Sequence, residues 1–93
     1  MVHPTSPQEL IEALRRLAAH EPADLEELRA LVDECTALKL YISASSSLAN
    51  STPESVWHFL SDADIRFKDP RYARAQLTGL ASTLAQWERQ SAA

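Results

Sequence analysis

The segment 61–74, SDADIRFKDPRYAR, holds the residue types in this chain that could do chemistry. It contains three aspartates, four basic residues and two aromatic side chains. Closely spaced carboxylates can hold a divalent cation, whereas clustered basic groups bind phosphates or nucleic acid. Together with Trp57 and His58, which precede it by a few residues, the segment supplies the candidate interaction surface of the protein. That surface consists of Trp57, His58, Asp62, Asp64, Arg66, Lys68, Arg71, Tyr72 and Arg74.

The spacing of the aspartates does not fit a calcium loop. An EF-hand loop that begins at Asp62 requires glycine at its sixth position and glutamate at its twelfth, where this chain has Phe67 and Ala73. The three histidines are scattered and do not combine with Cys35 in any zinc-ligand spacing. We therefore expect neither a metal site nor a cofactor.

Nucleophilic catalysis is also not supported by the sequence. Cys35, the single cysteine, falls on an apolar row of a predicted helix, where burial raises the pKa of a thiol and keeps it protonated. The serines are numerous, but none lies in a G-x-S-x-G elbow. The residue pattern therefore favours a non-catalytic protein.

The charge is unevenly distributed along the chain. The net charge is −4, with −5 over residues 1–34 and +1 over residues 35–93. The acidic first part argues against general nucleic-acid binding and suits a partner with a basic face. In the second part, Arg71 and Arg74 lie near the start of a predicted helix, where the helix dipole attracts anions.

The first residues, the hydropathy and the cysteine content of the sequence indicate the cellular compartment of the protein. The opening MVHPTSPQEL has neither the basic nor the apolar region of a signal peptide. No apolar run approaches the length of a membrane span, and a lone cysteine suits a reducing environment. We expect a cytoplasmic protein that does not bind membranes.

Four capping signatures divide the chain into helices. Each has a side chain that can accept a hydrogen bond from the first helical turn, and three have proline at the first helical position. The signatures are Ser6–Pro7, Asp24, Thr52–Pro53 and Asp69–Pro70. They predict an all-α fold, a small antiparallel bundle of four helices over about 7–20, 24–49, 53–62 and 70–89. The bundle forms a single domain over 1–93, and we expect residues 1–5 and 90–93 to fray.

The predicted helix over 24–49 is unusually apolar. Its middle carries apolar residues most of the way round, Leu40 included, which indicates burial on several sides or a subunit interface. Asn50 is predicted to end this helix in the left-handed conformation. In the last helix, Ala75, Gly79 and Ser82 form a row of small residues, which fits either a close helix crossing or a tolerant surface.

These observations predict a small interaction module, an accessory, regulatory or inhibitor-like protein that docks a partner on a helix face. The partner is another protein or a second copy of the chain. One alternative is a protein that binds a small ligand or anion through the segment 66–74, or an enzyme active as an oligomer that uses it. A second alternative is a nucleic-acid binder.

Overall fold

Helix-capping side chains set the architecture, which a computed structural model describes for residues 6–92. Within this part of the chain every regular element is a helix, as predicted, and the fold has six of them. They are α1 (Pro7–Ala19), α2 (Leu25–Ala44), α3 (Ser46–Ser51), α4 (Glu54–Ser61), α5 (Ala63–Lys68) and α6 (Pro70–Ala92). The predicted fraying of residues 1–5 lies outside the described residues.

Two of the predicted helix starts form as the sequence indicates. Ser6 Oγ accepts a hydrogen bond from the Glu9 N–H at 3.3 Å, and Pro7 occupies the first position of α1. Asp24 Oδ1 accepts from the Glu27 N–H at 2.9 Å at the start of α2. Each bond satisfies a backbone donor that has no partner within its helix.

The start of α6 was also predicted correctly. Asp69 Oδ1 accepts hydrogen bonds from the backbone N–H groups of Arg71 at 3.0 Å and Tyr72 at 3.2 Å. Pro70 takes the first helical position, where its missing N–H costs nothing. The helix then continues to Ala92, three residues beyond its predicted end.

The prediction of one helix over 24–49 is wrong. The helix breaks at Ser45, whose backbone is extended and whose Oγ accepts from the Leu48 N–H at 3.4 Å to begin α3. Serine hydroxyls compete for backbone hydrogen bonds, and a run of serines at 45–47 favours such a break. Asn50 is not a left-handed stop, because it lies inside α3 and no residue from 6 to 92 has a positive φ.

The region 52–68 also differs from the prediction. Pro53 precedes α4 without a side-chain capping bond, and Thr52 Oγ1 donates instead to the Leu48 carbonyl at 2.6 Å. The stretch read as a connection between the last two predicted helices contains the short helix α5. The helix predicted over 53–62 therefore forms as α4 (Glu54–Ser61), and the short helix α5 (Ala63–Lys68) replaces most of the loop expected after it.

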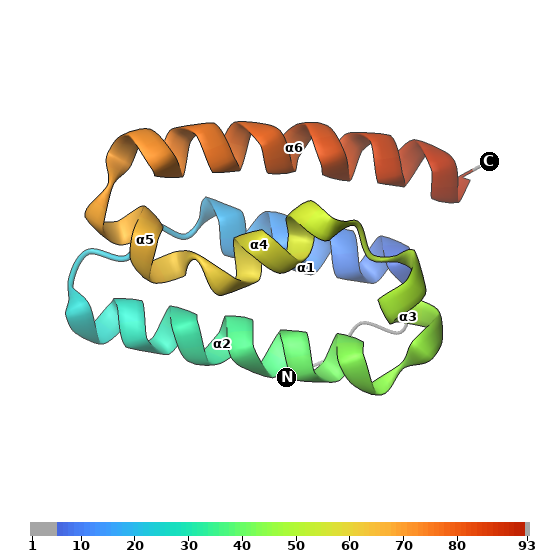
Figure 1. Ribbon diagram of the computed structural model, residues 1–93, viewed down its shortest axis with the longest axis horizontal. Coiled ribbons are helices and arrows are strands. Elements are labelled where there is room, and N and C mark those ends of the chain that lie inside the picture. The colour runs from blue at the N-terminus through green and yellow to red at the C-terminus, as the bar shows by residue number, and fades with distance from the viewer. Residues whose placement is uncertain (1–5, 93) are drawn as a thin grey trace.

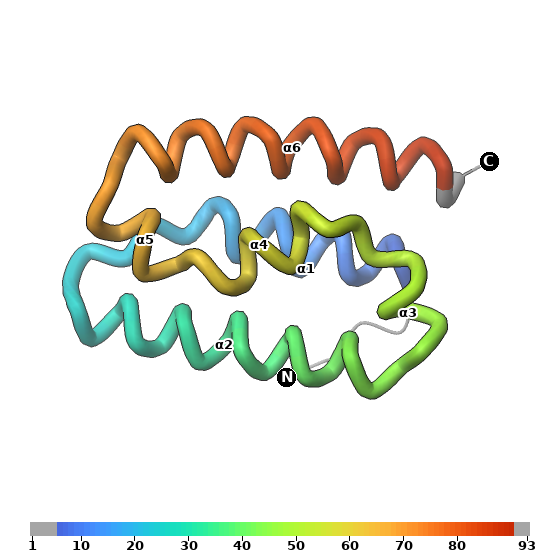
Figure 2. Tube along the Cα trace, viewed as in Figure 1, coloured from blue at the N-terminus to red at the C-terminus, as the bar shows by residue number. Residues whose placement is uncertain are grey.

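The four longer helices lie side by side with alternating directions. Figure 1 shows α1 and α4 running one way and α2 and α6 running the other, with α3 and α5 at the corners. The tube in Figure 2 shows the same path, in which α2 and α6 form opposite edges of the molecule. The helices α4 and α6 pack closely together, α1 packs on α6, and α2 packs on α4.

The core lies between these helices and follows the predicted apolar rows. Phe59, Leu10, Leu14 and Leu84 are almost completely buried, and Trp87 is a core residue rather than a surface one. Leu77, Leu80, Leu84 and Trp87, spaced three and four residues apart, therefore form the side of α6 that faces the core. The full buried apolar set is Leu10, Ile11, Leu14, Leu28, Leu31, Cys35, Ile42, Leu48, Val56, Phe59, Leu60, Ala63, Leu80, Leu84 and Trp87.

The small-residue row of α6 does not mark a close crossing within the described chain. A Cβ atom added at Gly79 would meet no atom within 4 Å, and Gly79 has an ordinary helical backbone. Replacing Gly79 with alanine should therefore raise the free energy of unfolding by about 0.5–1 kcal/mol, through the lower entropy of the unfolded chain. Urea denaturation followed by circular dichroism measures this gain. The reverse change at the exposed Ala75, Ala75→Gly, should cost a similar amount, and a loss of stability in Gly79→Ala would contradict the open environment.

Candidate functional site

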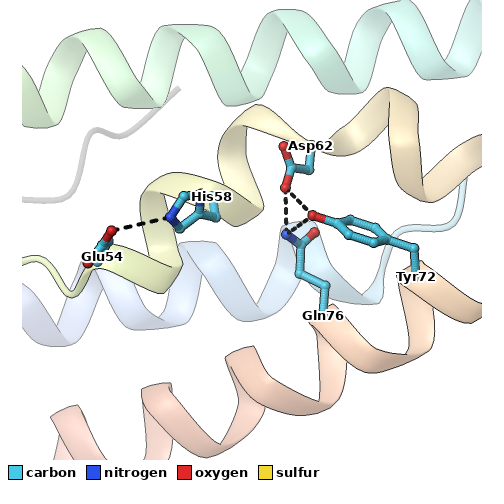
Figure 3. A network of polar contacts seen from close by, with 5 residues as sticks. All are labelled: Glu54, His58, Asp62, Tyr72 and Gln76. Atoms are coloured by element: carbon cyan, nitrogen blue, oxygen red, sulfur yellow. Dashed lines mark hydrogen bonds and ion pairs between the residues drawn. The ribbon is translucent and has the colours of Figure 1, made fainter.

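A polar network lies where α4, α5 and α6 meet. Asp62, at the junction of α4 and α5, accepts a hydrogen bond from the Tyr72 hydroxyl at 2.5 Å and another from Gln76 Nε2 at 2.9 Å. Figure 3 shows Tyr72 and Gln76 reaching from α6 toward the same carboxylate. We call Asp62, Arg66, Tyr72 and Gln76 the Asp62 network.

Arg66 is the cation of this network and is directed into the protein. Its Nη1 donates to the Phe59 carbonyl and to Gln76 Oε1, both at 2.6 Å. Its guanidinium carbon lies 4.1 Å from the centroid of the Phe59 ring, a cation–π contact. Burial lowers the pKa of Arg66 from its ordinary value. Since Gln76 binds Arg66 through its oxygen and Asp62 through its nitrogen, it joins cation and carboxylate without a direct ion pair.

The Asp62 carboxylate is held in its charged form. Burial by itself raises the pKa of Asp62, but the hydrogen bonds from Tyr72 and Gln76 oppose this and leave the pKa below its usual range. The pKa of Tyr72 is raised by the same hydrogen bond, because the bond requires the phenol proton. Both directions follow from the hydrogen bonds that join the junction of α4 and α5 to α6.

Removing the Tyr72 hydroxyl should move the titration of Asp62. In Tyr72→Phe the pKa of Asp62 should rise, as measured by NMR titration of the labelled carboxyl carbon. In the wild type this pKa lies below the unfolded value of about 3.9, so the stabilisation is present above that pH and is lost as the pH falls through the folded pKa. Arg71→Ala, a change at an exposed neighbour, is the control and should leave the pKa of Asp62 unchanged. If the pKa of Asp62 were unchanged in Tyr72→Phe, the result would contradict the hydrogen bond between Tyr72 and Asp62.

The other basic residues of the candidate surface are not gathered into this network. Lys68, Arg71 and Arg74 are exposed, and none makes an ion pair or side-chain hydrogen bond with residues 6–92. The amide groups at the start of α6 are already bonded to the Asp69 carboxylate. An anion at this helix end would meet that negative charge, which weighs against a phosphate site here.

The remaining predicted surface residues have separate environments. Trp57 is half-buried and packs against the core, so it is not a free surface aromatic. His58 is exposed, and its Nε2 lies 3.4 Å from Glu54 Oε1, as Figure 3 shows. Asp64 is exposed on α5. The predicted surface therefore divides into an internal network, a core-packing tryptophan and scattered exposed charges.

The described residues offer no arrangement for metal or thiol chemistry. No three histidine, cysteine or acidic side chains within 6–92 lie close enough to hold a metal ion. Cys35 is fully buried, and burial raises the pKa of its thiol. Over the same residues, none of the helices combines the length and apolarity that a membrane span requires.

The outer face of α2, which we define by Leu25, Val32 and Leu40, is an exposed apolar surface. Leu25 is 64% exposed, Leu40 is 67% exposed and Val32 is 37% exposed. The apolar middle of this helix was predicted to be buried on several sides or to lie in an interface, and within the chain the first reading is wrong. Gln76 was also missed, because a glutamine in a helix gives no sequence signal of its two bonding partners.

The comparisons with known proteins add no relative. No protein-family model, no curated protein and no solved structure matches this chain.

Proposed function

We propose that this protein is a non-catalytic interaction module that docks a partner protein on the outer face of α2. One observation carries this proposal. Leu25, Val32 and Leu40 present most or a large part of their side chains to water on the same helix. Single exposed apolar residues are common, but an aligned set on one helix face is typical of a docking surface.

The three side chains form a stripe along α2. At 100° per residue, Leu25 and Val32 lie about 20° apart around the helix axis and Leu40 lies about 60° from Leu25. With a rise of 1.5 Å per residue the stripe is about 22 Å long. A stripe of this length suits an amphipathic helix that lies along it, with anchors every one or two turns.

The position of α2 leaves this face open within the described chain. Figure 1 shows α2 along one edge of the molecule, with α1, α4 and α6 all to one side of it. We propose that α1, α2, α4 and α6 act as an antiparallel four-helix bundle in which α3 and α5 are corners. In such a bundle α2 contributes Leu28, Leu31 and Cys35 to the core, and the exposed side chains of Leu25, Val32 and Leu40 to a partner.

The test compares capture of partners by three forms of the protein. The apolar-face variant carries Leu25→Ser, Val32→Ser and Leu40→Ser, and the control variant carries Ile65→Ser, which removes a 44% exposed apolar side chain from α5. We expect the wild type and the control to retain a common partner that the apolar-face variant loses. The purified partner should then bind the apolar-face variant at least about 100-fold more weakly, as three lost apolar anchors imply.

Two outcomes would contradict the proposal. A wild-type protein that sediments as a strict monomer and captures no partner has no docking function. A partner retained by the apolar-face variant and lost by Ile65→Ser would move the docking surface to the segment 57–74. Circular dichroism of each variant shows whether its helices are intact.

The exposed cations of the segment 57–74 favour a second candidate function, the binding of a small anion by their side chains and not by the start of α6, whose amides are bonded to Asp69. Lys68, Arg71 and Arg74 are exposed cations with no partner within residues 6–92. Titration with inorganic phosphate, followed by NMR of the arginine side chains, tests this candidate. Shifts at Arg71 and Arg74 that saturate would support it, whereas shifts that grow linearly with ionic strength would show screening alone.

A further inference from the structure

We draw no further inference here: the strongest candidate, the row of small residues between Arg71 and Arg89 on the exposed side of α6, has no second feature that points to a ligand, and nothing among residues 6–92 shows what covers it.

Discussion

Phe59→Ala should destabilise the protein by about 3–5 kcal/mol. Phe59 is completely buried in α4, between the helices that form the core. Its ring also carries the Arg66 guanidinium, so the change removes a cation–π contact together with apolar burial. A domain of this size has a free energy of unfolding of about 5–14 kcal/mol, and the loss is a large part of it.

Urea denaturation followed by circular dichroism gives the free energy of unfolding of this variant. The matched control is Leu40→Ala, which truncates a large apolar side chain that is 67% exposed. Since Leu40 lies outside the core and alanine favours helices, the control should change stability by less than about 0.5 kcal/mol. Similar losses in the two variants would show that Leu40 is covered in solution or that Phe59 is not a core residue.

Arg66→Ala should cost about 2 kcal/mol, a large effect for a polar side chain. The change removes two charge-assisted hydrogen bonds, to the Phe59 carbonyl near the end of α4 and to Gln76 on α6. Arg66→Lys should recover less than half of the loss, because one ammonium group cannot hold both acceptors and lie over the Phe59 ring as the planar guanidinium does.

The other arginines of the same segment provide the control. Arg71→Ala and Arg74→Ala each remove an exposed side chain without a partner within residues 6–92, so each should alter stability by less than about 0.5 kcal/mol. Thermal or urea unfolding of the three alanine variants makes the comparison. Equal losses at all three positions would mean that the segment acts as one electrostatic unit, contrary to the geometry.

The helical fold was predictable where local signals are strong. The caps at Ser6, Asp24 and Asp69 specify helix starts by satisfying backbone donors, and the 4,3 apolar spacing from Leu77 to Trp87 specifies the buried face of α6. These features depend on neighbours within one or two turns. They therefore could be read without knowledge of the packing.

The breaks between helices depend also on packing between segments that are distant in the sequence, and they were predicted poorly. The break at Ser45 lets α3 turn Leu48 into the core, whereas the apolar periodicity alone continued past this point. The same limit applies to Leu40, because a helix that is apolar on most sides does not reveal which side its neighbours cover.

The candidate surface could be predicted in composition but not in arrangement. The sequence identified Asp62, Arg66 and Tyr72 as chemically capable groups, yet it left open whether the basic residues face their own aspartates. The structure gives a mixed outcome, in which Arg66 is linked to Asp62 through Gln76 and the other basic side chains of the segment remain exposed. That linkage depends on the corner made by α5, a helix that the sequence reading did not contain.

Methyl NMR of a partner complex tests the docking proposal most directly. Wild-type protein labelled at leucine, valine and isoleucine methyl groups is titrated with the partner purified after capture. The proposal predicts that the methyl signals of Leu25, Val32 and Leu40 shift together and saturate, while that of the exposed Ile65 does not move. Saturating shifts at Ile65, with Leu25, Val32 and Leu40 unchanged, would show that the partner binds elsewhere and that the outer face of α2 is not the docking surface.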